Sequence, residues 1–224
     1  MSDALTRILA AAERGEFPPP DGMTTVVPQP SGRDAGVLAF TAHSVVFTDE
    51  DPEWVRDTLA ATSSDPLAAS MNPGFLSALM ARTGRTMNTI DLLSVAPARS
   101  GPPELPLREI EDPDHPRVAR ALQHRDDVRM WTADGGVLVL GRGVAGRWEA
   151  AVEVDLEARG AGLGPRLADA ARHLIPEGAH VWAQKSPGNA RSVRTFQLAG
   201  FRPVGSEALL LPADRDFPHR SPHR

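Results

Sequence analysis

The chain has 224 residues and a formal net charge of −5, and its apolar fraction of 41% and charged fraction of 24% are those of an ordinary globular protein. It contains no cysteine, which excludes disulfides and thiolate zinc sites, and no apolar run approaches the ~20 residues that span a bilayer. With no basic surplus in either half and no signal-like start, we expect a cytoplasmic protein without nucleic-acid or membrane partners.

Residues 1–96 show the pattern of a small α/β domain. Apolar residues at helical spacing predict a helix at residues 4–14. Asp51-Pro52 and Asn72-Pro73 each predict the start of a further helix, because an Asx cap followed by proline suits a helix N-terminus. Short apolar and β-branched runs predict strands at residues 24–27, 37–40, 44–47 and 89–93.

A proline-rich stretch separates this part from the rest. Residues 96–103 contain three prolines and a glycine, which favour an extended linker over regular structure. We therefore predict an N-terminal α/β domain of unknown role at residues 1–96, a linker at 97–104, a second domain at 105–211 and a tail at 212–224.

The second domain alternates strands and helices more regularly. Helices are expected at residues 115–123, 164–174 and 186–199, the last opened by Ser186-Pro187. Strands are expected at residues 105–110, 128–132, 137–140, 147–154, 180–183 and 201–211. Because a meander of strands is followed by alternating strands and helices, we expect an α/β (α+β) fold with a mixed, twisted sheet and flanking helices.

Gly141–Gly146 is a formal GxGxxG sequence that follows a predicted strand. Such a sequence binds dinucleotides where a helix follows it, whereas Trp148, Val152 and Val154 alternate as in a strand. We interpret the segment as a glycine-rich hairpin turn and keep an NAD(P)-binding protein as an alternative.

A second glycine cluster lies between a predicted strand and the helix expected at residues 164–174. Its glycines allow backbone N–H groups to approach a phosphate closely, and the helix start adds further N–H groups and a positive dipole. Arg159 adds a fixed charge. The cluster therefore suits a phosphate site, although an ordinary strand-to-helix loop has the same outline. Its members are Arg159, Gly160, Ala161, Gly162, Leu163 and Gly164.

Residues 152–164 and 189–201 together resemble two motifs of the GNAT acyltransferase superfamily. The first segment resembles its acyl-coenzyme A loop. The second has Asn189, Phe196 and the pair Gly200-Phe201 at the spacings of the family's later motif. The resemblance covers about half of the chain and implies a GNAT-like fold for residues 105–211. It also implies acetyl-CoA as co-substrate and acetyl transfer to an amine.

The resemblance implies a role for each matching position. In the family, the strand before the loop separates from its neighbour and its backbone binds the pantetheine arm, a role that falls to Val152 and Val154. The diphosphate would lie on residues 159–164, and backbone donors near the thioester carbonyl would stabilise an oxyanion. Asn189 and the helix that it opens, with Ser192 and Phe196, would contact the pantetheine or the acyl end.

An amine acceptor has to lose a proton, and Glu149 and Glu153 are the candidate bases because they lie on one face of the strand before the loop. A solvated polar strand face is the alternative interpretation. The chain contains no tyrosine, and Phe196 stands where many members of the family have a tyrosine that protonates the leaving thiolate. A non-catalytic acyl-CoA-binding module is therefore a second hypothesis.

The remaining expectations concern partners. The acceptor is expected to be a small-molecule or peptide amine, and a homodimer is one option for assembly. Residues 1–96 would cap the acceptor pocket, form a dimer surface or represent a decayed acyltransferase half. The histidines show no metal-ligand spacing, so no metal is expected, and His124 either faces the acceptor or belongs to a polar turn.

Overall fold

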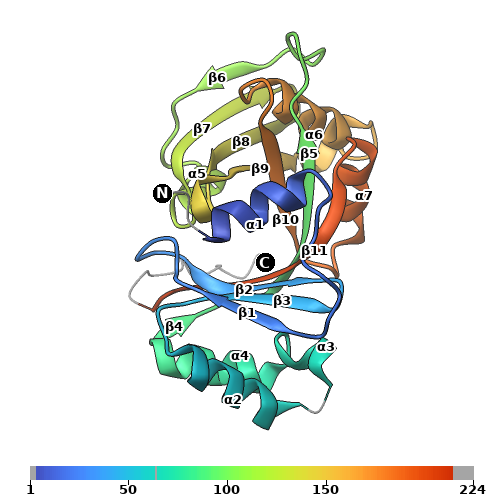
Figure 1. Cartoon of the computed structure of the whole chain (residues 1–224). Coiled ribbons are helices and arrows are strands. Elements are labelled where there is room, and N and C mark those ends of the chain that lie inside the picture. The colour runs from blue at the N-terminus through green and yellow to red at the C-terminus, as the bar shows by residue number, and fades with distance from the viewer. Residues whose placement is uncertain (1–3, 64, 214–224) are drawn as a thin grey trace.

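The strands form one mixed sheet that runs through both predicted domains (Figure 1). The computed structural model describes residues 4–63 and 65–213. In chain order the elements are α1 (Ala4–Glu13), β1 (Thr24–Val27), β2 (Ala35–Phe40), β3 (His43–Phe47), α2 (Pro52–Thr62), α3 (Pro66–Ala69), α4 (Pro73–Thr83), β4 (Arg85–Thr86), β5 (Ile90–Pro97), β6 (Arg108–Ile110), α5 (Pro116–Leu122), β7 (Asp126–Ala133), β8 (Gly136–Arg142), η1 (Val144–Gly146), β9 (Trp148–Val154), η2 (Leu156–Ala158), α6 (Leu163–His173), β10 (His180–Lys185), α7 (Ala190–Leu198) and β11 (Arg202–Pro212). The strand order is β1-β3-β2-β11-β5-β10-β9-β8-β7-β6, with β4 beside β11.

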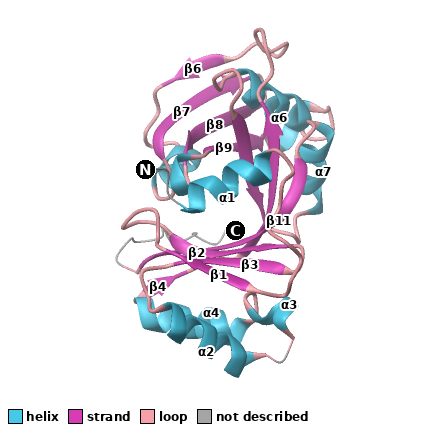
Figure 2. Cartoon of the chain, viewed as in Figure 1, coloured by secondary structure: helices cyan, strands magenta, loops and turns pink. Residues whose placement is uncertain are grey.

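Alternating side chains give the sheet two faces, and helices lie on both (Figure 2). The first, here called the α5 face, packs Leu93 and Trp182 against α1 and packs Met130 and Val139 against α5. The second, the α6 face, packs Leu138 and its neighbours against α6 and α7, and at its other end it meets α2 and α4. A residue's position along a strand therefore decides which set of helices it meets.

The helix α6 shows how the sequence fixes one of these contacts. Leu163, Leu167 and Ala171 recur at helical spacing and join the core between α6, α7 and the sheet. Leu167 is 0% exposed, and complete burial of a leucine side chain contributes roughly 1.5–3 kcal/mol. The predicted amphipathic helix is thus confirmed, and its N-terminus is held at the end of the loop that follows β9.

The strand β5 connects the two predicted domains. It lies in the middle of the sheet, antiparallel to β10 on one side and to β11 on the other. Its last residue, Pro97, pairs with His180, so the strand includes the first residue of the predicted linker. A separate N-terminal domain is not apparent in a continuous sheet, and the boundary at residues 97–104 stays a prediction.

Most predicted elements form, and the differences lie mainly at their ends. The side chains of Asp51 and Asn72 cap α2 and α4, so both predicted helix starts are confirmed. The helix expected from Ser186 begins instead at Ala190, because the side chain of Asn189 accepts a backbone hydrogen bond and caps α7.

Other differences are small. The strand expected at residues 105–110 is confined to β6, and the short elements α3 and β4 were not predicted. β11 includes Pro212, the first residue of the predicted tail, and residues 214–224 of that tail lie outside the described residues. Among the described residues, no helix is long and apolar enough to cross a membrane.

Candidate functional site

The parallel strands β9 and β10 separate soon after they meet. Only two residue pairs join them, Val181 with Trp148 and Trp182 with Glu149. Beyond this point β9 stays paired with β8 as far as Val154, while β10 continues beside β5. The side of residues 150–154 that faces β10 therefore has no strand partner, which confirms the expected separation and leaves backbone groups for a ligand.

A cleft of about 650 Å³ opens where the two strands part. Its lining includes Val152 and Phe196, which belong to the α6 face, and Glu149 and Glu207, which belong to the α5 face. Gly164, at the start of α6, also lines it. The cleft therefore reaches residues of both faces of the sheet at the point where β9 and β10 part.

The predicted phosphate loop lies at the α6 side of this cleft. Gly160 and Gly162 have φ values of +90° and +76°, which favour glycine, and a side chain at either position would meet open space. In the described part of the chain, no side chain caps the N-terminus of α6, so its first N–H groups remain available to an anion. Arg159 is exposed and its Nε donates to the carbonyl of Val154 at 3.2 Å. Leu163 points into the core instead of toward the cleft.

The N-terminal part of α7 forms another wall on the same side. Asn189, Ser192 and Phe196 all line the cleft, as the sequence motif predicts. Phe196 is 3% exposed and packs edge-on against Phe201, with ring centroids 4.9 Å apart. Lys185, at the end of β10, places its Nζ 5.0 Å from the centroid of the Phe196 ring.

Glu149 lies on the α5 side of the cleft and is 1% exposed. Its Oε1 accepts from Arg147 Nε and its Oε2 accepts from Arg125 Nε, each at 2.8 Å. Burial opposes ionisation, but the charges of Arg147 and Arg125 hold the pKa of Glu149 below its usual range. A carboxylate whose two oxygens are both engaged and whose pKa is low is a weak proton acceptor.

Glu207 extends this buried network to β11. Arg147 Nη2 donates to both of its carboxylate oxygens, at 2.8 and 2.9 Å, and Gln184 Nε2 donates to one of them at 3.2 Å. Burial raises the pKa of Glu207 although Arg147 opposes the shift. Arg147 joins Glu149 and Glu207, so these charges link β9 to β11 across the two intervening strands, β10 and β5.

Two further carboxylates line the same side. Glu153 is ion-paired with Arg117 of α5, and its side chain is 42% exposed. Asp91 of β5 is opposite Glu207 in the strand register, and burial raises its pKa against the opposing charges of Arg120 and Lys185. Both carboxylates are more open to a ligand than Glu149.

His124, at the end of α5, also lines the cleft. Burial, followed by the charge of Arg125, lowers its pKa to about 4, so the ring is neutral at pH 7. Its buried Nδ1 has no hydrogen-bond partner among the described residues. His124 thus belongs to the turn that follows α5, as one of the two interpretations of the sequence expected, and it also lines the cleft.

The first glycine cluster has a structural role. Gly141 and Arg142 end β8, and Gly143–Gly146 begins the turn to antiparallel β9, as the strand-like alternation predicted; no α-helix follows it. A Cβ on Gly143 would overlap the carboxyl group of Glu149. Glycine at this position therefore makes room for the buried carboxylate, and the helix that a dinucleotide site requires is missing here.

The structure brings most of the predicted site residues together. The following line the cleft: Glu149, Val152, Glu153, Val154, Arg159, Gly164, Asn189, Ser192 and Phe196. Gly160, Ala161, Gly162 and Leu163 do not line it, and they form the adjoining loop and helix start.

Sequence reasoning missed Asp91, Gln184, Lys185 and Glu207. Only Lys185 carried a signal, as the only lysine of the chain and the residue just before the Asn189 segment. The other three reach the cleft through strand pairings that are distant in sequence.

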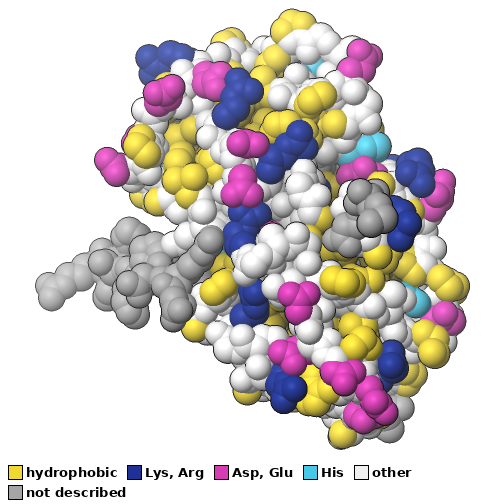
Figure 3. Space-filling model, turned by 60° about the vertical axis from the view of Figure 1, so that its left-hand side comes forward, with side chains coloured by type: hydrophobic (Ala, Val, Ile, Leu, Met, Phe, Trp, Pro, Cys, Tyr) yellow, Lys and Arg dark blue, Asp and Glu magenta, His cyan; other side chains and the backbone are white. Residues whose placement is uncertain are grey.

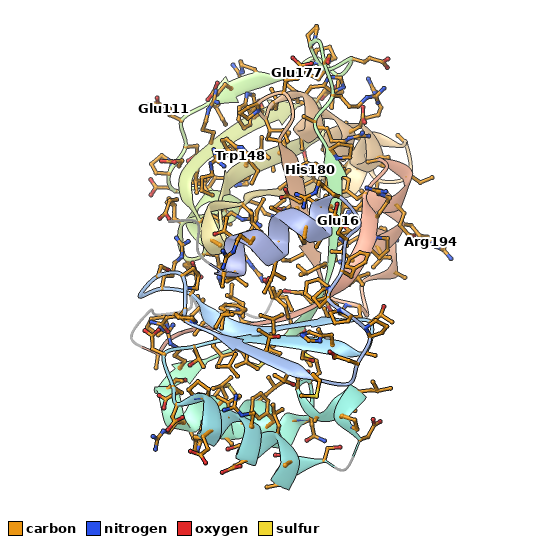
Figure 4. All side chains as sticks on the ribbon, viewed as in Figure 1. Glu16, Glu111, Trp148, Glu177, His180 and Arg194 are labelled. Carbon is orange, nitrogen blue, oxygen red and sulfur yellow. The ribbon has the colours of Figure 1, made fainter. Side chains whose placement is uncertain are left out.

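Elsewhere the described surface offers weaker candidates. On the side shown in Figure 3, basic and acidic side chains are interspersed. No group of three histidine, aspartate or glutamate side chains in residues 4–63 and 65–213 could hold a metal ion. A smaller cavity of about 180 Å³ lies beside α1, next to Trp148 and His180, which Figure 4 labels on neighbouring strands. Arg142 lies 3.7 Å from the Trp148 ring centroid there.

Comparison with known proteins gives structural similarities only. No family model matches the chain, and no curated protein matches it. A GCN5-related N-acetyltransferase from Kribbella flavida is 17% identical with a TM-score of 0.40, over 81% of this chain and 89% of that one. A second, from Sphaerobacter thermophilus, is 13% identical with a TM-score of 0.38, over 62% of this chain and 56% of that one.

A putative GNAT-family acetyltransferase from Novosphingobium aromaticivorans is 19% identical with a TM-score of 0.38, over 57% of this chain and 67% of that one. The chain thus spans little more than half of the Sphaerobacter protein. Similarity at this level assigns neither an activity nor the role of any residue.

Proposed function

We propose that the protein binds an acyl-coenzyme A thioester on the α6 side of the cleft and transfers its acyl group, an acetyl group in the simplest case, to an amine that enters from the α5 side. The observation that carries this proposal is the gap between β9 and β10, which connects an uncapped, glycine-rich helix start with a row of carboxylates across the sheet. The resemblance of residues 152–164 and 189–201 to GNAT motifs supports it.

The residues present fit an acyl-CoA. The N–H groups of residues 162–164 and the charge of Arg159 would hold the diphosphate, and Pro165 supplies no donor. The unpaired edge of β9 at Val152 and Val154 would bind the amides of the pantetheine arm. Asn189 and Ser192 would lie beside its acyl end. When bound, the thioester supplies an activated acyl group.

The residues on the α5 side would prepare the acceptor. Among the bases predicted on β9, Glu153 suits proton removal better than Glu149, whose two oxygens are held by arginines. Asp91 is a second candidate, because its raised pKa brings a partly buried carboxylate closer to neutral pH. Glu149 would then position β9 without exchanging a proton.

The decisive experiment is a thermal-shift titration with acetyl-CoA, CoA and NAD(P), since a ligand that binds the native state raises its melting temperature. Gly162→Asp would place a negative charge where the diphosphate is expected. Aspartate tolerates the left-handed conformation of Gly162, and the position faces open space, so the fold should survive.

Gly178→Asp is the matched control, because Gly178 has a φ of +79° and also faces open space, but it follows the other end of α6. We expect acetyl-CoA to stabilise the wild type and Gly178→Asp but not Gly162→Asp. Stabilisation by NAD(P) alone would contradict the proposal.

Turnover is measured as free-thiol release with a panel of small-molecule and peptide amines. Glu153→Gln and Asp91→Asn would identify the base, because the variant that lacks it loses activity while still binding acetyl-CoA. Acetyl-CoA binding with no turnover across the panel would favour the non-catalytic acyl-CoA-binding module. The cytoplasmic location and the homodimer stay predictions.

A further inference from the structure

Lys185 is the only lysine in the chain, and its side chain lines the cleft although it is 4% exposed. It belongs to the α6 side, because its register partner Leu92 alternates with Asp91 and Leu93 of the α5 face. Its Nζ lies 5.0 Å from the centroid of the Phe196 ring. The amine is therefore on the side of the sheet where we place the acyl-CoA.

The surroundings of this amine are unusual for a buried cation. Its Nζ donates to Ser94 Oγ and, at 3.0 Å, to the carbonyl of Ala183. Among the described residues no carboxylate forms an ion pair with it, and neutral groups seldom compensate a buried charge. Burial lowers the pKa of Lys185 to about 8, against the opposing charge of Asp91. Such an amine can give up a proton near neutral pH.

The cleft has an uneven distribution of proton donors and acceptors. Asp91, Glu149, Glu153 and Glu207 all lie on the α5 side. On the α6 side, the other polar side chains that line the described cleft are hydroxyls, amides and the guanidiniums of Arg159 and Arg191, which do not release protons at neutral pH. Lys185 is the group on that side whose proton can be transferred.

We propose that Lys185 stabilises and protonates the sulfur that leaves the acyl group, a role that the neighbouring Phe196 cannot fill because its side chain has no proton to donate. This inference rests on the proposed function. As the bond between the acceptor nitrogen and the acyl carbon forms, the C–S bond breaks and its electron pair stays on sulfur. A proton moves from Lys185 Nζ to that sulfur, the amine's proton goes to a carboxylate on the α5 side, and solvent returns a proton to Lys185.

The donor and the acceptor of this proton have similar pKa values. An ordinary thiol has a pKa of about 8.5, close to the value that burial gives Lys185. Proton transfer is most efficient when donor and acceptor are matched in this way near the working pH. A neighbouring ammonium group also lowers the pKa of a thiol, so Lys185 would favour the thiolate before it is protonated.

The test needs no acceptor, because free CoA carries the same sulfur. The thiolate absorbance of CoA bound to the protein is followed against pH in the wild type, Lys185→Met and Lys185→Arg. We expect a lower thiol pKa in the wild type than in Lys185→Met, by one unit or more. Arginine keeps the charge, so Lys185→Arg should retain much of the lowering but none of the proton transfer.

Arg194→Met is the matched control, because Arg194 is an exposed cation on α7 that does not line the cleft. It removes one positive charge and should leave the thiol pKa unchanged. A second readout is the titration of the Lys185 side chain by NMR. A lysine-labelled sample gives one Nζ signal, and bound CoA thiolate should raise its pKa.

The outcomes separate the two proposals. If CoA does not bind the wild type, the proposed function fails, and this inference fails with it. If CoA binds but its thiol has the same pKa in the wild type and in Lys185→Met, only the role of Lys185 is refuted. An Nζ titration that bound CoA leaves unmoved also refutes that role.

Discussion

Replacing Lys185 with methionine should stabilise the protein near pH 7, although the substitution removes a residue from the candidate site. Burial lowers the pKa of Lys185 from 10.5 to about 8. At ~1.4 kcal/mol per pKa unit, keeping the amine charged in the folded state disfavours folding by about 3 kcal/mol. Methionine fills a similar volume but forfeits the hydrogen bonds to Ser94 and Ala183, which contribute ~1 kcal/mol each.

The net gain should therefore be about 1–2 kcal/mol at pH 7, where the folded and unfolded states both carry the proton. Between pH 8 and 10.5 the unfolded chain binds more protons at this site than the folded one. The wild type then gains stability relative to Lys185→Met as the pH rises, and the variant's advantage disappears across that window.

Urea denaturation of both proteins at pH 7 and at a pH near the upper end of this window measures the difference directly. Arg194→Met serves as the control, because Arg194 is an exposed cation that points outward from α7 (Figure 4). Its removal should change stability by less than ~0.5 kcal/mol, with no trend across the window. A Lys185→Met variant that is much less stable at pH 7, or whose difference from the wild type ignores pH, would refute the reasoning.

Three further substitutions test the framework around the cleft. Gly143→Ala should destabilise the protein by ~3 kcal/mol or more in thermal denaturation, because its Cβ would displace the carboxyl group of Glu149 from its arginines; a loss below ~1 kcal/mol would argue against that packing. Glu149→Gln should lower the free energy of unfolding by ~3 kcal/mol in urea, since Arg147 and Arg125 lose the carboxylate charge that both contact; an unchanged midpoint would speak against the network. Asn189→Ala should cost α7 about 1 kcal/mol of stability, whereas Asn189→Asp keeps the cap, and equal stabilities would show that the cap is dispensable.

The parts of the site that the sequence revealed are those encoded locally. The loop at residues 159–164 and the cap Asn189 depend on glycine conformation and helix ends, which a few consecutive residues determine. The alternation of β9 likewise placed Glu149 and Glu153 on one face, and both line the cleft. Such features can be predicted from spacing alone.

The rest depends on pairings between distant segments. β5 lies between β10 and β11, and this insertion brings Asp91 to the cleft and Ser94 to Lys185 from a segment that we expected to fold separately. Likewise, the low pKa of Glu149 depends on Arg125, which lies 24 positions away in sequence. Contacts between residues so far apart in the chain leave no periodic pattern in the sequence, so neither contact could be predicted.

The pleat of the sheet explains why Lys185 and the carboxylates lie on opposite sides of the cleft. Asp91 and Ser94 differ by three positions on β5, so they point to opposite faces of the sheet. Ser94 holds Lys185 on the α6 side, while Asp91 joins the carboxylates on the α5 side. β9 and β10 part at this point. A C–N bond that forms in the gap between them would therefore have the carboxylates as proton acceptors on one side and Lys185 as the proton donor on the other. That separation keeps Lys185 from forming an ion pair with the carboxylates, which would raise its pKa and remove its ability to donate near neutral pH.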